Sequence, residues 1–155
     1  MKKVYCVFIV FVLVTLITSP CRSQEVIVSY DKSAKSINVT VTNNTDGKMF
    51  IINSNPTRAS GSDVCLQLKD IEQETLHATS LMLMCKGDTK PKNSYVISAR
   101  SKIEFQMNLY PHLNILDYSR LKKVKRINLN VMIVYSLETN SKSLKPILVN
   151  KNYDF

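Results

Sequence analysis

Apolar and polar side chains alternate along several short stretches of the chain, and this pattern predicts β-strands. Every odd position from Ile103 to Leu109 is apolar, and so is every odd position from Ile127 to Tyr135. Because successive side chains of a strand point to opposite faces, each stretch predicts a strand with one buried face. Shorter stretches with the same period surround Val26, Val39, Val64, Leu81 and Ile147.

A polar segment between two apolar ones, residues 39–52, is interpreted as a β-hairpin. Val39 and Val41 alternate with threonines, five polar residues follow, and the apolar pattern resumes at Met49. Asn, Asp and Gly tolerate the left-handed backbone that tight hairpins require. The pattern therefore predicts a hairpin turn at residues 43–47.

The number and spacing of the strands predict an all-β fold. Seven or eight short antiparallel strands, with one short helical segment within residues 116–126, are typical of a β-sandwich or a small barrel. Periodicity leaves both open, and we favour an Ig-like β-sandwich. The chain holds three glycines, five prolines and no repeat, which favours a single domain over residues 24–155.

The N-terminal residues have the composition of a signal peptide. Two lysines precede the uncharged apolar run Val4–Ile17, which is shorter than the roughly 20 residues of a membrane-spanning helix. We predict that residues 1–23 are removed after Ser23, which leaves no transmembrane segment. Lipidation of Cys21 is an alternative, although Pro20 is not the small residue that such signals need. The predicted location is periplasmic or secreted.

The mature chain would keep two cysteines, Cys65 and Cys85. Removal of residues 1–23 leaves 132 residues and lowers the formal charge from +9 to +6. In an oxidising compartment, two cysteines most simply form one disulfide. A bridge across this loop of about 20 residues would stabilise the fold by roughly 3 kcal/mol. Two unpaired thiols are the alternative.

Catalytic and metal-binding motifs are not recognisable in the sequence, so we predict no enzyme, no cofactor and no metal. His77 and His112 lie outside known nucleophile motifs, and three glycines do not suffice for a phosphate-binding loop. Residues 77–85 combine imidazole, thioether and thiol groups, which suit Cu(I). On a strand, however, Met82 and Met84 point away from Cys85, and methionine is an ordinary core residue, so core packing is the prediction.

The same segment has a second interpretation, a protease-inhibitor loop. A methionine or leucine held beside a disulfide can enter a protease's specificity pocket, and a rigid loop loses less entropy on binding. Against this, residues 80–84 alternate like a strand and contain no Pro or Gly.

Five cations are concentrated within residues 120–126: Arg120, Lys122, Lys123, Lys125 and Arg126. A solvated surface is the simplest interpretation. Among the functional ones, we favour cations that steer an acidic protein toward an exposed edge of the following strand, where a second chain would add by backbone hydrogen bonds. An anionic surface is an alternative partner, and nucleic acid is not expected for an exported protein.

Three segments resemble the first domain of periplasmic pilus chaperones of the PapD-like type. These are residues 26–52, with two strands around a polar turn, residues 95–105, and the alternating strand 126–135. The resemblance implies an Ig-like fold, and a strand that lends apolar side chains to an incomplete partner by β-augmentation. The chain shows no counterpart of the chaperones' second domain, and the two cysteines are not part of the family's pattern.

These features together predict an exported β-sandwich that binds another protein without catalysis. A chaperone-like, immunity or inhibitor protein of a bacterium is the favoured class. A secreted ligand-binding or adhesion module is the alternative. The triplets that begin at Asn38 and Asn43 match the N-glycosylation pattern, which matters only in a eukaryotic or viral source.

Overall fold

The computed structural model describes residues 24–53 and 61–155, which form nine β-strands and two short helices. This composition confirms the predicted all-β class. The predicted signal peptide, residues 1–23, lies outside the described residues. The elements are β1 Gln24–Asp31, β2 Ser36–Asn43, β3 Met49–Ile52, β4 Asp63–Lys69, β5 Thr75–Leu81, β6 Ser94–Ile97, β7 Ser101–Asn108, α2 Tyr110–Leu113, α3 Tyr118–Lys123, β8 Arg126–Leu137 and β9 Asn140–Asp154.

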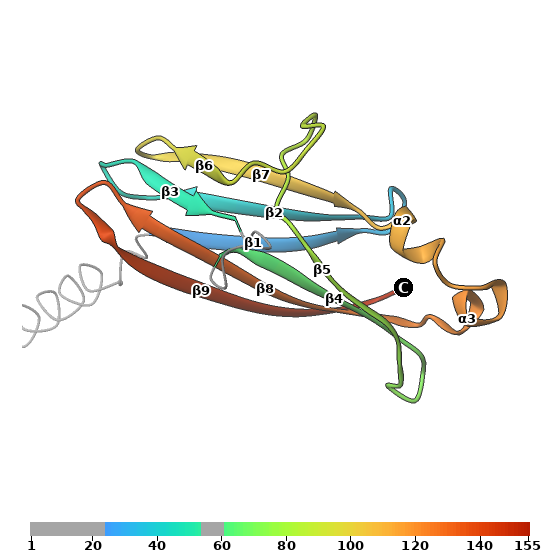
Figure 1. Ribbon diagram of the computed structural model, residues 1–155. Helices are drawn as coiled ribbons and strands as arrows, with labels where there is room; N and C mark the ends of the chain where they lie inside the picture. The colour runs from blue at the N-terminus through green and yellow to red at the C-terminus, as the bar shows by residue number, and fades with distance from the viewer. Residues whose placement is uncertain (1–23, 54–60) are drawn as a thin grey trace, which may run out of the picture.

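The strands form two antiparallel sheets that curl around a shared core (Figure 1). The first sheet has the order β1-β2-β7. In the second sheet, β8 lies at the centre, with β4 and β3 end to end along one side and β9 along the other. β5 continues the sheet beyond β4, and β6 continues it beyond β3. The two sheets together form a curled half-barrel. Its antiparallel strands agree with the predicted all-β fold, whereas the Ig-like β-sandwich stays a prediction.

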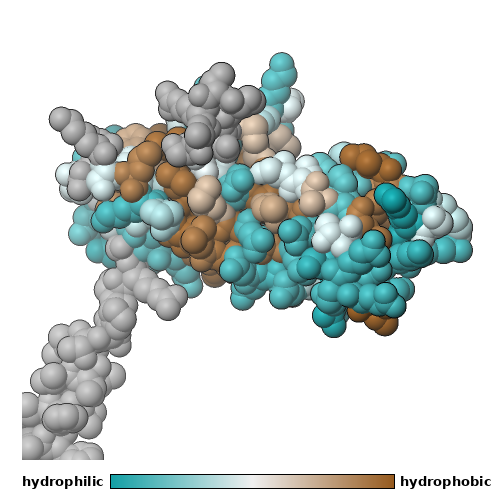
Figure 2. All heavy atoms as spheres, turned by 60° about the horizontal axis from the view of Figure 1, so that its bottom comes forward, coloured by the Kyte–Doolittle hydropathy of each residue, from teal (hydrophilic) through white to brown (hydrophobic). Residues whose placement is uncertain are grey.

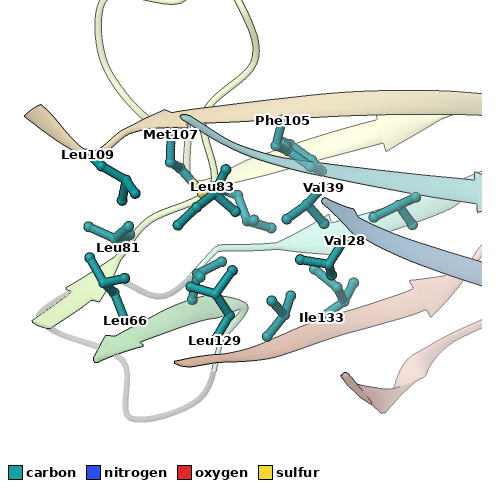
Figure 3. Close-up of a cluster of buried hydrophobic side chains, with 14 of the residues drawn as sticks. Val28, Val39, Leu66, Leu81, Leu83, Phe105, Met107, Leu109, Leu129 and Ile133 are labelled. Carbon is teal, nitrogen blue, oxygen red and sulfur yellow. The ribbon is translucent and has the colours of Figure 1, made fainter. Parts of the chain in front are cut away.

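The core follows the predicted alternation. Ile127, Leu129, Val131 and Ile133 of β8 are buried, with exposed or half-buried residues between them. Figure 3 shows Leu129 and Ile133 pointing from β8 toward Val28 and Val39 of the first sheet. Between the sheets, the rings of Phe105 and Tyr95 meet edge to face with centroids 4.9 Å apart. Each sheet therefore buries the face that its apolar positions mark.

The predicted hairpin over residues 39–52 is wrong. β2 pairs with β1 and β7 in the first sheet, whereas β3 pairs with β6 and β8 in the second. Residues 43–47 therefore form an arch between the sheets. None of these five residues has the positive φ that a tight hairpin turn would need.

Asn43 explains why the chain arches here. Its side chain is fully buried, and its Nδ2 donates to the carbonyl oxygens of Gly47, Ile97 and Ser98 at 2.8, 3.3 and 3.0 Å. Its Oδ1 accepts from the backbone N–H and the hydroxyl of Thr45 at 3.1 and 2.7 Å. One amide therefore fastens the arch to the turn between β6 and β7. A glycan on Asn43 is incompatible with these bonds.

After β5, the chain crosses from the second sheet to the first. β5 pairs with β4 as far as Leu81, and the carbonyl oxygen of Met84 then accepts the N–H of Gln106 at 2.8 Å. Cys85 forms an isolated antiparallel bridge with Phe105 of β7. We call residues 82–85 the crossing segment.

The first and last described residues lie at opposite ends of the sheets (Figure 1). Gln24 pairs with Asn43 at one end of β2, whereas Asn108, just before α2, pairs with Ser36 at the other end. Phe155 donates its N–H to the carbonyl oxygen of Lys125, 2.9 Å away. The C-terminus therefore lies beside the helices, and the start of β1 lies far from them.

Candidate partner-binding site

The connection between β7 and β8, residues 109–125, closes one end of the half-barrel. We call this connection, together with Arg126 at the start of β8, the helical end. Buried Leu113, Leu116 and Val124 anchor it to the core. Asp117 caps α3, with its Oδ1 accepting from the N–H of Arg120 at 2.8 Å and from the Ser119 hydroxyl at 2.6 Å. These bonds lower the pKa of Asp117, the Ser119 hydroxyl most, so the cap stays ionised at neutral pH.

The five predicted cations all lie on this end and are exposed: Arg120, Lys122, Lys123, Lys125 and Arg126. The first three occupy the last turn of α3, where positive charge is favourable to the helix dipole. The structure therefore brings the predicted partner-binding residues together on one surface.

Most of this charge is uncompensated. Arg126 Nε lies 4.0 Å from a carboxylate oxygen of Asp154, and both side chains are exposed. The Lys122 ammonium lies 4.2 Å from the ring centroid of Tyr118. Within residues 24–53 and 61–155, no carboxylate lies at ion-pair distance from Lys122, Lys123 or Lys125. An acidic partner would meet these charges without first breaking an internal ion pair.

Large apolar side chains are exposed on the same end. Tyr110, Ile115 and Tyr118 are 50%, 66% and 72% exposed. Ile71, 77% exposed, lies on the β4–β5 turn at the same end, where Lys69 of β4 pairs with Arg126 (Figure 1). Figure 2 shows brown, hydrophobic residues among teal, hydrophilic ones at this right-hand end of the molecule. Scattered apolar residues are normal on a surface, but apolar residues gathered beside cations are typical of a binding site. The strand pattern did not predict these four residues, because they lie outside the alternating stretches.

The predicted exposed edge after the cations is wrong. β8 pairs with β4 from Arg126 to Met132 and with β3 from Val134 to Leu137. On its other side, it pairs with β9 along almost its whole length. Both sides of β8 are therefore occupied, and no second chain can add there. The regular alternation marked a central strand rather than an edge.

The predicted disulfide is also absent, because the thiols of Cys65 and Cys85 are free. Cys65 lies between buried Val64 and Leu66 on β4, so it points to the outer face of the second sheet. Cys85 is bridged to Phe105 of the first sheet. The two cysteines thus belong to different sheets. The crossing segment also has buried Leu83 and backbone bonds to β7, so it is not the exposed disulfide-flanked loop expected of an inhibitor.

Thiol reactivity provides a direct test of this arrangement. The denatured protein should show two thiols for Cys65 and Cys85 with a chromogenic thiol reagent. In the folded protein, burial and the Asp88 carboxylate raise the pKa of Cys85, so little thiolate is present at neutral pH. Its alkylation by iodoacetamide should therefore be slow at pH 7 and accelerate toward alkaline pH. A denatured protein without reactive thiols would instead support the bridge.

No three His, Cys, Asp or Glu side chains of the described part gather as they would around a metal ion. None of the helices within residues 24–53 and 61–155 has the length and apolar character needed to span a membrane.

Comparisons with known proteins place the chain in no family. No protein-family model and no curated protein matches it. Among solved structures, a structural-genomics target, SoR45, is 9% identical and covers 84% of this chain and 85% of its own, with a TM-score of 0.47. A Bordetella pertussis protein with the provisional name ApaA is 10% identical and covers 83% of this chain and 90% of its own, with a TM-score of 0.45.

Proposed function

We propose that this protein is an exported, non-catalytic binding protein whose helical end docks an acidic protein. The observation that carries the proposal is the coincidence on one surface of five exposed cations with exposed Tyr110, Ile115 and Tyr118. Neither group alone would distinguish this surface from an ordinary solvated one. Together they provide both parts of a protein interface, apolar anchors and a charged surround.

The two groups would contribute differently to binding. Tyrosine offers a large contact area with few rotatable bonds, and Tyr118 already has its ring covered by Lys122. The lysines would mainly raise the association rate and make it sensitive to salt, because exposed charges are screened beyond about 10 Å at 0.1 M salt. We therefore expect affinity to depend on the aromatic residues, and salt dependence on the cations.

The site is held in shape before any partner binds. Leu113, Leu116 and Val124 are buried, Asp117 caps α3, and Lys125 donates its N–H to the carbonyl oxygen of Lys69 at 2.8 Å. A segment that is already ordered loses little conformational entropy on binding. This supports recognition by a rigid surface rather than by a strand that adds to a sheet edge.

The wider class follows from the predicted export and from the all-β fold. We infer an Ig-like protein of the periplasm or the cell exterior, of the chaperone-like, immunity or inhibitor kind, which binds its partner through the helical end. The PapD-like resemblance supports the fold part of this proposal. It does not extend to β-augmentation of a partner by β8, because β8 is already paired on both sides. A ligand-binding or adhesion module is the second candidate, favoured by the exposed apolar residues alone.

The experiment compares two variants of equal charge. One replaces Arg120, Lys122, Lys123 and Lys125 with glutamine. The control replaces exposed cations elsewhere, Lys86, Lys90, Lys145 and Lys151. The immobilised wild-type protein would capture partners from exported proteins of the source organism, and each captured protein would be titrated at low and high salt. We expect an acidic partner whose affinity falls at least about tenfold in the first variant, with weaker salt dependence, and changes less than threefold in the control.

A further variant, Tyr118→Ser, separates the two contributions. The substitution should lower the affinity for the same partner. The dependence of this affinity on salt should stay unchanged, because no charge is altered. Equal binding by the wild type and the helical-end variant would overturn the proposal. So would equal losses in the helical-end variant and the control, since these would reflect net charge alone.

A further inference from the structure

The outer face of the second sheet carries a group of amide side chains on three neighbouring strands (Figure 1). Asn128 and Asn130 of β8 alternate with buried residues, so they point outward. On β9, Asn152 pairs with Asn128, and Asn150 pairs with Asn130. On β4, Gln67 pairs with Asn128 from the other side. Because paired residues of neighbouring strands share a face, these five side chains lie side by side, and we call them the amide face.

The surface around the amides is uncharged across four strands. Cys65 of β4 pairs with Asn130, and the small residues Ala78 and Ser80 of β5 pair with Gln67 and Cys65. Neighbouring strands lie about 4.8 Å apart, and alternate residues of one strand about 7 Å apart. The amide face therefore offers hydrogen-bonding groups at short, regular intervals, without a lysine, arginine or carboxylate among them.

The first sheet shows what an ordinary solvated face looks like in this protein. On its outer side, Thr40 and Thr42 of β2 pair with Glu104 and Lys102 of β7. The Lys102 ammonium lies 2.9 Å from a carboxylate oxygen of Glu104, and both side chains are exposed. Threonine favours strands, and exposed charges keep a surface solvated. The amide face has neither charges nor threonines, so it differs from the solvated face of the same molecule.

Stability of the sheet does not explain the amides. Asparagine is depleted in strands, because its side chain competes with the ladder for backbone hydrogen bonds. Within residues 24–53 and 61–155, none of the five side chains of the amide face forms an internal hydrogen bond. Each amide thus keeps two N–H donors and an acceptor oxygen for an external molecule. Unfavourable local choices without an internal compensation are typical of functional sites.

A cavity of about 180 Å³ adjoins the amide face. Asn128 and Asn152 form part of its wall, together with Gln73, Arg126 and Asp154. Arg126 Nε lies 4.0 Å from a carboxylate oxygen of Asp154, so the two charges balance each other. The cavity therefore combines donors and acceptors on several sides with no net charge.

These groups select one class of ligand. An ion would meet no net charge, and an apolar ligand would cover the amides without satisfying them, which is costly. A sugar hydroxyl donates and accepts a hydrogen bond, as an amide does. We propose that the amide face binds a neutral glycan chain, with one sugar ring in the cavity and the following rings across Asn130 and Asn150. The proposal does not rest on protein docking at the helical end, although Arg126 borders both surfaces.

The test observes the side-chain amides directly, in ¹⁵N–¹H spectra of the full mature chain. The probes are four neutral hexasaccharides: cellohexaose, maltohexaose, mannohexaose and chitohexaose. At least one should shift the side-chain signals of the amide face. The signals of Asn38 and Gln106, a cross-strand amide pair on the outer side of the first sheet, should stay in place. No shift with any probe, or equal shifts on both sheets, would overturn the proposal. So would tighter binding of polygalacturonate, which is anionic.

Substitution then tests the contacts. Asn128→Ala combined with Asn152→Ala should lower the affinity for the bound hexasaccharide at least about tenfold, measured by calorimetry. Asn38→Ala combined with Gln106→Ala, the matched pair on the first sheet, should change it less than threefold. Circular dichroism would check that each variant is folded. If the first double variant does not fold, Asn130→Ala alone should lower the affinity at least about threefold. Equal affinities in the two double variants would refute the site.

A last comparison separates this site from the helical end. The variant with glutamine at positions 120, 122, 123 and 125 should bind the hexasaccharide as the wild type does, because it leaves the amide face and Arg126 intact. A loss of at least tenfold in this variant would place glycan binding at the helical end and overturn the proposal.

Discussion

Replacing Leu129 with alanine should lower the free energy of unfolding by about 3–4 kcal/mol. Leu129 is fully buried at the middle of β8, opposite Leu66 of β4 and Lys151 of β9. The substitution removes buried methyl groups and leaves a cavity that neighbours in three paired strands have little freedom to fill. The loss would be measured by urea denaturation, as a lower midpoint with an unchanged slope.

Leu148→Ala is the matched control, because it makes the same chemical change on the neighbouring strand. Leu148 is 70% exposed on β9. Its truncation should change the free energy of unfolding by less than about 0.5 kcal/mol. Similar losses in the two variants would contradict the assignment of the inner face of β8 to the core.

Replacing Asn43 with alanine should cost about 3 kcal/mol, although no apolar contact is lost. The carbonyl oxygens of Ile97 and Ser98 would lose the Asn43 donor, and the backbone N–H of Thr45 would lose its acceptor. The Thr45 hydroxyl could still donate to the Gly47 carbonyl oxygen, 3.2 Å away. Buried polar groups that lose their partners keep the penalty of desolvation, about 1–3 kcal/mol each where water cannot enter. Urea denaturation would again measure the loss.

Asn130→Ala provides the comparison, since Asn130 is exposed on β8. It should change the free energy of unfolding by less than about 0.5 kcal/mol. A loss below about 1 kcal/mol for Asn43→Ala would show that water replaces the amide. The arch would then depend on the chain on either side of it rather than on this side chain.

Strand positions were predictable because burial of one face leaves a period of two in the sequence. The stretches around Val26, Val64, Phe105 and Leu129 all became strands, and α3 lies within the predicted helical segment. Short β6 and most of β5 were not predicted. In β5, Thr75, Ala78 and Ser80 are exposed and carry no apolar signal.

Strand partners were not predictable, since alternation says which face is buried but not which neighbour is paired. Residues 43–47 have the composition of a hairpin turn, yet the buried amide of Asn43 makes them an arch between sheets. The same limit explains β8, whose regular pattern fits an edge strand and a central strand equally well. The predicted disulfide failed for a related reason, because sequence spacing does not show that Cys65 and Cys85 lie on different sheets.

The candidate site was predictable in its charges but not in its apolar part. A run of cations is visible in any sequence, and buried Val124 together with the Asp117 cap keeps that run on the surface. The sequence alone does not show which apolar residues of this segment are exposed. In the fold, Leu113 and Leu116 occupy the core, and Tyr110, Ile115 and Tyr118 are left on the surface.

The placement of Gln24 and Phe155 at opposite ends of the sheets decides how this protein should be attached to a support. Strands of eight residues at about 3.3 Å per residue separate Gln24 from the helical end by roughly 25 Å. A tag or linker joined ahead of Gln24 would hold the cations outward, toward solution. A tag fused after Phe155 would lie beside Lys125 and obstruct the same surface. Binding at the helical end should therefore be measured with the protein attached through its N-terminal side. Attachment through the C-terminal side serves as the control, because it obstructs the helical end.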